Sequence, residues 1–159
     1  MSNYKVKIDE YGTKRYYLNG NLHREDGPAV EYADGEKLWY KNGFLHREEG
    51  PALEWADGAK SWYKEGKLHR EDGPAFEAAN GDKEWLKNGL THREEGPAVE
   101  WANGDKYWYK NDNLHREDGP AIERADGNKE WHLNSIKYGD NDAFTNESWK
   151  KFVNSLIFS

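Results

Sequence analysis

The sequence repeats itself every 23 residues, and this period limits the folds that are open to the chain. Histidines recur at one position of the unit, prolines at a second and tryptophans at a third. No copy carries an insertion, so every loop has kept its length. A period of this size is typical of stacked arrays, in which each unit buries its apolar face against the next. The recurring residues are His23, His46, His69, His92 and His115; Pro28, Pro51, Pro74, Pro97 and Pro120; and Trp39, Trp62, Trp85, Trp108 and Trp131.

The composition is that of a folded chain, although aliphatic residues are few. The 8 tryptophans and 10 tyrosines supply apolar side chains that disordered chains lack. A formal net charge of −7 disfavours nucleic acid and anionic membranes as partners, because like charges repel. The absence of cysteine excludes a disulfide framework and a thiolate metal site. Because the sequence shows no apolar targeting segment, we expect a cytoplasmic location.

The periodicity predicts an all-β fold, an elongated single-layer twisted antiparallel sheet of stacked β-hairpin repeats with a short C-terminal capping helix. We expect an atypical N-terminal hairpin over residues 1–15, the repeat array over residues 16–138, and a linker with the capping helix over residues 139–159. Thr145 is a suitable N-cap for that helix, and Phe144 should pack on Trp149 as a hydrophobic staple. The apolar side of the helix consists of Trp149, Phe152, Val153, Leu156 and Ile157.

Asp-Gly and Asn-Gly pairs lie between the predicted strands and favour type I′ turns, in which both central residues have positive φ. In the second copy such a turn at Asp57-Gly58 would place Leu53 opposite Trp62. The tryptophans would then share the core face of the sheet with Leu53 and its equivalents. The repeated lysines, of which Lys60 is one, would lay their aliphatic stems over the aromatic rings.

The unit Trp-Tyr-Lys-Asn-Gly-x-x-His-Arg-Glu-x-Gly-Pro-Ala, followed by Asp-Gly, resembles the variant MORN repeat (membrane occupation and recognition nexus). The resemblance covers about residues 10–137 and rests on the period and on the aromatic-x-x-x-Gly-x-x-His core. The unit departs from the common form in having Arg-Glu after His, where that form has Gly, and in carrying Gly-Pro-Ala. This sub-type is similar to repeats of uncharacterised bacteriophage and giant-virus proteins. Variant MORN repeats also occur in bacterial proteins described as antitoxins.

The resemblance implies a row of β-hairpins in one twisted sheet and a non-catalytic binding or scaffolding role. It also implies the host cytoplasm as the location if the protein is viral. Lipid binding, which has been suggested for some MORN proteins, is disfavoured here by the negative charge.

Five His-Arg-Glu-(Asp/Glu) tetrads suggest a metal site or acid–base chemistry, but the expected geometry opposes both. Equivalent residues in stacked hairpins lie about 10 Å apart, whereas zinc ligands lie about 2 Å from a shared ion. A catalytic site needs unlike groups that converge once, and here the same groups recur. We therefore expect no enzymatic activity, no metal and no cofactor. The His and Arg side chains should hold their loops through hydrogen bonds, and loop carboxylates such as Glu48 should be solvated or paired with arginine.

Positions that differ between otherwise matching copies are candidates for recognition, because scaffold positions face the same neighbours in every copy. Large apolar and aromatic residues at such positions favour a protein interface. We therefore expect a non-catalytic protein-binding module with an extended curved surface, and a partner with a basic surface. A competing interpretation is that Trp55 and Trp101 extend the core. The candidate binding residues are Phe44, Trp55, Trp101, Tyr107, Tyr32 and Leu90.

Two alternative functions stay open on the sequence. The first is a more specific form of protein binding, an antitoxin-like or phage-encoded inhibitor of a bacterial effector. The second is an enzyme or a small-ligand binder that uses the groove of the coiled sheet, and a pocket with one convergent polar cluster would favour it. The sequence does not specify the partner, the binding face of the sheet or the oligomeric state.

Overall fold

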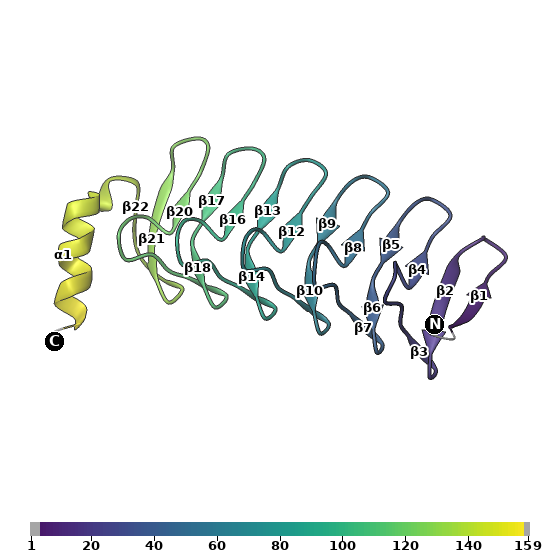
Figure 1. The fold of residues 1–159 in the computed structure, drawn as a ribbon. Coiled ribbons are helices and arrows are strands. Elements are labelled where there is room, and N and C mark those ends of the chain that lie inside the picture. The colour runs from purple at the N-terminus through teal and green to yellow at the C-terminus, as the bar shows by residue number, and fades with distance from the viewer. Residues whose placement is uncertain (1–3, 158–159) are drawn as a thin grey trace. The chain divides into compact units, whose positions relative to one another are not determined.

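The computed structural model describes residues 4–157, apart from the side chain of Ile157, and divides into two compact units. The first unit holds the described residues up to Asn80 together with Lys87–Gly89. The second holds Gly81–Leu86 and the described residues from Leu90 onward. Antiparallel strands build both units, and one helix follows the last strand (Figure 1). The predicted all-β array of antiparallel hairpin repeats with a short C-terminal helix is confirmed.

In the first unit, the strands of the main sheet follow the order β1-β2-β4-β5-β8-β9-β12, and β3 pairs with β2. Two further hairpins, β6-β7 and β10-β11, are separate from this sheet. A repeat therefore supplies two short strands to the main sheet and one small hairpin beside it. The strands are β1 (Lys5–Ile8), β2 (Lys14–Leu18), β3 (Asn21–Leu22), β4 (Val30–Glu31), β5 (Lys37–Leu38), β6 (Tyr40–Lys41), β7 (Phe44–Leu45), β8 (Leu53–Glu54), β9 (Lys60–Ser61), β10 (Tyr63–Lys64), β11 (Lys67–Leu68) and β12 (Phe76–Glu77).

The second unit repeats this plan with the strand order β13-β16-β17-β20-β21-β22 and a small hairpin, β18-β19. The division between the units falls within β14 (Leu86–Lys87) and before β15 (Leu90–Thr91). After the last strand come a 3-10 turn, η1, and the helix α1. The elements are β13 (Lys83–Glu84), β16 (Val99–Glu100), β17 (Lys106–Tyr107), β18 (Tyr109–Lys110), β19 (Asn113–Leu114), β20 (Ile122–Glu123), β21 (Lys129–Leu133), β22 (Ile136–Asp140), η1 (Asn141–Ala143) and α1 (Asn146–Ile157).

The Asp-Gly loops have a different geometry from the predicted type I′ turn. In the second copy the N–H of Trp55 donates to the carbonyl of Ala59, so the loop contains three residues. Only Gly58 has a positive φ, of 94°, because the carboxylate of Asp57 accepts the N–H of Ala59 and holds an ordinary right-handed turn before the glycine. The predicted register is therefore wrong by one residue.

This shift decides which side chains share a face of the sheet. Leu53 lies opposite Ser61, and Glu54 lies opposite Lys60. Because successive side chains alternate between the faces, Leu53 and Ser61 share the buried face. The predicted placement of the tryptophans beside Leu53 is wrong. Trp62 follows Ser61 and lies on the opposite face with Glu54 and Lys60, where it is half-buried.

The type I′ turn occurs at the other end of the repeat, in the small hairpins. Asn42 and Gly43 connect β6 to β7 with φ values of 53° and 84°. Tyr40 pairs with Leu45, and Lys41 pairs with Phe44. Asparagine followed by glycine suits this turn, because both residues tolerate positive φ.

One copy places glutamate at this strained position and offers a test of the turn. Glu65 has φ of 51° where the first and second described small hairpins, at Asn19 and Asn42, carry asparagine. We expect Glu65→Asn to raise the free energy of unfolding by about 1 kcal/mol, because asparagine adopts the left-handed conformation at lower cost. Urea denaturation measures the change. The reverse substitution, Asn42→Glu, should lower stability by a similar amount, and equal stability of all three proteins would contradict the predicted strain.

The C-terminal helix follows the predicted pattern. The N–H of Ser148 donates to the hydroxyl of Thr145, and the N–H of Thr145 donates to the hydroxyl of Ser148. These are the two reciprocal hydrogen bonds of a capping box, with Thr145 as the N-cap. The rings of Phe144 and Trp149 pack with their centroids 4.9 Å apart, which confirms the staple. Among the described residues, no helix is long and apolar enough to cross a membrane.

Candidate binding grooves between the repeat loops

An arginine stacked on an aromatic ring organises each His-Arg-Glu loop. The guanidinium carbon of Arg47 lies 3.9 Å from the ring centre of Trp39. Nη1 of Arg47 donates to the carbonyl of Pro51 at 2.9 Å and to Oε1 of Glu54 at 3.1 Å. The cationic groups stacked on the rings at this position are those of the arginines. The other stacked pairs are Arg24 on Tyr16, Arg70 on Trp62, Arg93 on Trp85 and Arg116 on Trp108.

The glycine before each proline leaves room for this arginine. A Cβ atom on Gly73 would lie 2.7 Å from the guanidinium carbon of Arg70, and one on Gly119 would lie 2.8 Å from that of Arg116. A side chain at either position would require the guanidinium group to shift from its stacked place. Each residue of the Gly-Pro-Ala triplet therefore has its own role. The glycine lets the guanidinium approach the backbone, the proline carbonyl accepts a hydrogen bond from the arginine, and the alanine packs in the core. That alanine is completely buried in the second copy, at Ala52.

The histidine of each loop connects one repeat to the next. Nδ1 of His46 accepts the backbone N–H of Glu65, which lies in the following small hairpin, at 3.1 Å. Because Nδ1 accepts, Nε2 carries the proton and donates to Oε1 of Glu48 at 2.8 Å. The prediction that His and Arg hold the loops through backbone and carboxylate hydrogen bonds is confirmed. In the described part of the chain, no group of three or more His, Asp or Glu side chains could hold a metal ion.

The loops alternate between two forms along the chain. Where the tetrad ends in Asp, as at Asp72, the carboxylate accepts from Nε of the arginine, here Arg70, at 2.8 Å. Where it ends in Glu, as at Glu49 and Glu95, the carboxylate is exposed and makes no hydrogen bond or ion pair with the residues that the structure describes. The longer side chain thus leaves an uncompensated negative charge in every second loop.

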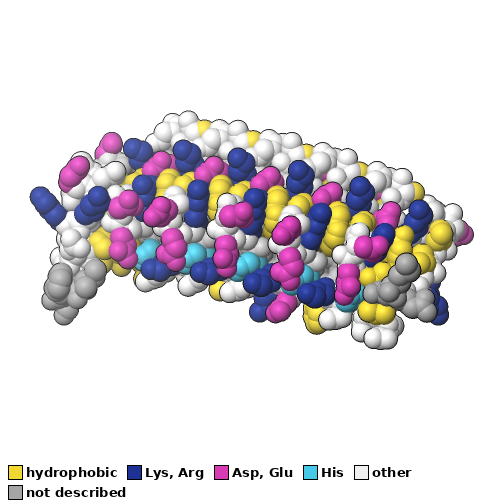
Figure 2. Space-filling view, viewed as in Figure 1, with side chains coloured by type: hydrophobic (Ala, Val, Ile, Leu, Met, Phe, Trp, Pro, Cys, Tyr) yellow, Lys and Arg dark blue, Asp and Glu magenta, His cyan; other side chains and the backbone are white. Residues whose placement is uncertain are grey.

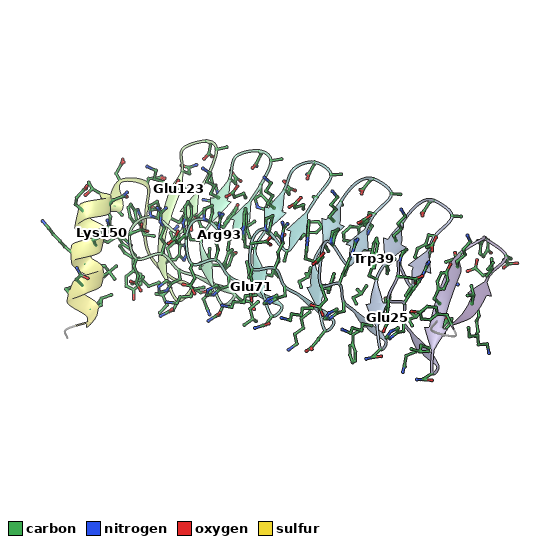
Figure 3. All side chains as sticks on the ribbon, in the orientation of Figure 1. Glu25, Trp39, Glu71, Arg93, Glu123 and Lys150 are labelled. Carbon is green, nitrogen blue, oxygen red and sulfur yellow. The ribbon has the colours of Figure 1, made fainter. Side chains whose placement is uncertain are left out.

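Within each unit, successive loops enclose equivalent grooves, two in the first unit and one in the second. Each groove has one loop on either side and a tryptophan among its lining residues, and we name the grooves after that residue. The Trp39 groove has a volume of 630 Å³, the Trp62 groove 670 Å³ and the Trp108 groove 480 Å³. Figure 2 shows histidine and acidic side chains recurring together on this face, and Figure 3 labels Trp39 with Glu25.

Carboxylates outnumber cationic side chains in each groove. The Trp62 groove contains four carboxylates, Glu48, Glu49, Glu71 and Asp72, against Arg47, Lys64 and Arg70. The two arginines are also bonded to Glu54 and Glu77, which are not groove-lining residues.

Hydrogen bonds within the Trp62 groove favour the ionised form of two of its carboxylates. The hydrogen bond from His46 lowers the pKa of Glu48, and the hydrogen bond from Arg70 lowers the pKa of Asp72. Because both pKa values are lowered from the ordinary carboxylate values, Glu48 and Asp72 carry negative charge in this groove at physiological pH.

The candidate binding residues from the sequence occupy two different parts of the repeat. Trp55 lies at an Asp-Gly loop, half-buried, and its ring meets that of Phe76 edge-on with centroids 5.9 Å apart. Phe44 lies in a small hairpin, where its side chain is 59% exposed. In the first unit Tyr32 is at a position equivalent to Trp55. In the second unit Trp101 and Tyr107 are half-buried, and Leu90 is exposed.

Phe44 is the candidate that adjoins a groove. It lines a hollow of 480 Å³ that shares Lys41, His46 and Glu48 with the Trp39 groove. Sequence reasoning identified Phe44 but did not identify the grooves, because it treated the loop carboxylates as scaffold. The alternation of Asp and Glu at the end of the tetrad is the feature of the sequence that could have indicated a binding role for the loop carboxylates.

Comparison with protein-family models found none that matches the chain, and comparison with curated proteins found no match.

Proposed function

We propose that this chain is a non-catalytic protein-binding module that recognises a basic partner through the loop grooves and the adjoining Phe44. The recurrence of one groove, with the same residue types at the same places, supports this proposal. Catalysis needs a single convergent set of unlike groups, whereas a repeated set of contacts suits an extended partner. The resemblance of the unit to variant MORN repeats agrees with a binding role.

The partner's basic character follows from the groove charges. Exposed carboxylates attract cationic side chains and raise the rate of encounter. Phe44 adds an apolar contact to these charges, because it is an exposed aromatic ring beside the Trp39 groove that a partner can bury. Aromatic residues of this kind carry a large share of the binding free energy at protein interfaces.

Affinity capture with matched variants tests the proposal. Immobilised wild-type protein should enrich a basic protein from a lysate of the cells in which the chain is expressed. The Phe44→Ala variant should weaken binding of that protein by about 2 kcal/mol, measured by titration with the purified partner. Ile8→Ala is the control, because Ile8 is similarly exposed, at 63%, and lies on the edge strand β1. Equal binding by both variants would contradict the proposed surface.

A further inference from the structure

The Trp39 and Trp62 grooves are consecutive and share a wall. Arg47, Glu48 and Glu49 line both grooves, so the two sites are one repeat apart. A repeat adds two strands to the main sheet, and neighbouring strands lie about 4.8 Å apart, so equivalent points of the two grooves are separated by about 9.6 Å. An occupant of both grooves must present matching groups at that spacing.

The polyproline II helix has this spacing. It has three residues per turn and rises about 3.1 Å per residue, so every third side chain returns to the same side after about 9.3 Å. An extended β-strand returns to the same side after about 6.7 Å and does not match. We propose that the two grooves bind a basic, proline-rich segment of the partner in the polyproline II conformation, with one turn of the segment in each groove. The proposal rests on the protein-binding function proposed above.

The lining of the grooves matches both chemical features of such a segment. Trp39 lines one groove, and Trp62 with Tyr63 lines the other, so proline rings can pack on Tyr63 and on the part of each half-buried indole that its stacked arginine leaves uncovered. The carboxylates alone would accept any cation, and the aromatic residues favour a segment in which prolines separate basic residues placed at every third position.

Glu49 is the carboxylate through which both grooves attract a cation. It lines the two grooves and has no partner among the described residues, so a bound lysine or arginine displaces no existing ion pair. Glu48 differs, since it is bonded to His46 and lies 3.5 Å from Nζ of Lys41. The cationic side chain of the turn beside this shared wall therefore reaches Glu49 without disturbing the bonds that hold the loops, and the cation one turn further along lies beside Glu71 of the Trp62 groove.

Three synthetic peptides with the same number of lysines test the spacing and the conformation. The first repeats Lys-Pro-Pro, the second repeats Lys-Pro-Pro-Pro, and the third repeats Lys-Gly-Gly. The second has the same conformation but turns successive lysines to different sides, and the third has the spacing without the preformed helix. Titration calorimetry with the full chain should show the Lys-Pro-Pro peptide binding at least about tenfold more tightly than either control, with an affinity that falls as salt rises.

Matched variants locate the binding. Glu49→Gln should weaken the Lys-Pro-Pro complex by about tenfold, whereas Glu147→Gln, which removes an exposed carboxylate from α1, should leave its affinity unchanged. Equal affinity of the Lys-Pro-Pro and Lys-Pro-Pro-Pro peptides, an equal effect of both variants, or no binding of the Lys-Pro-Pro peptide would overturn this proposal. If a protein partner is still captured through Phe44 in any of those cases, the proposed protein-binding function stands. Only the proposal of a polyproline II segment is then wrong.

Discussion

Replacing Trp149 with alanine should lower the free energy of unfolding by about 3–5 kcal/mol, because the indole is completely buried. Its ring centre lies 5.4 Å from that of Trp131, 4.9 Å from that of Phe144 and 5.5 Å from that of Phe152. Its Nε1 donates to the carbonyl of Arg116 at 3.0 Å, so the substitution also leaves a carbonyl without its donor. Urea denaturation followed by circular dichroism measures the loss.

The control for this prediction is Lys151→Ala in the same helix. Lys151 is exposed, so its replacement should change the free energy of unfolding by less than about 0.5 kcal/mol. If Trp149→Ala is as stable as Lys151→Ala, then α1 does not close the aromatic cluster at the end of the second unit. A large loss would show that the helix is part of the folded core, as its pattern in the sequence predicts.

Replacing Arg70 with lysine should lower the free energy of unfolding by about 1–2 kcal/mol, although the charge is kept. The loss stays in this range because water can solvate the accessible acceptors Asp72 and Glu77 once their donor is lost. The guanidinium lies 4.0 Å from the ring centre of Trp62, and Nε donates to Asp72 at 2.8 Å. Nη1 donates to the carbonyl of Pro74 and to Oε1 of Glu77. An ammonium group can neither stack as a plane on the indole nor reach these three acceptors from one position, so at least two of them lose their donor.

The matched control is Lys64→Arg, an exchange of the same two residue types at an exposed position of β10. It should leave the urea midpoint unchanged, because Lys64 bonds to no acceptor among the residues that the structure describes. Arg70→Lys should shift the midpoint to lower urea. If the two variants behave alike, positive charge alone would hold the loop, and the stacking geometry would contribute nothing measurable.

Much of the fold follows from local patterns in the sequence. The strict period predicts a stack of hairpins, since only a repeated structure needs the same residues at the same places. The roles of His46 and Arg47 in holding their loop also follow, because equivalent groups one repeat apart cannot converge on one ion. The N-cap at Thr145 and the staple between Phe144 and Trp149 are short-range contacts within one turn of the chain. They therefore depend little on the rest of the fold.

The register of the main sheet could not be predicted in the same way. Asp-Gly suits both a two-residue type I′ turn and a three-residue loop that ends in a left-handed glycine. The two loops differ by one residue, and one residue exchanges the faces of the sheet. Packing decides between them. The observed loop buries Leu53 with Ser61 and places Trp39 under Arg47, whereas the predicted turn would have put the tryptophans in the core.

The sequence by itself determined the period, the class of fold, the loop-holding histidines and arginines, and the C-terminal helix, because each depends on spacing or on neighbours close in the chain. Only the tertiary structure decided which face carries the tryptophans and where the grooves lie. A groove needs two loops that are 23 residues apart in the sequence and side by side in space. The residues of two successive loops line one groove, so the groove forms only when the sheet register places those loops next to each other. The sequence of a single repeat therefore does not reveal it.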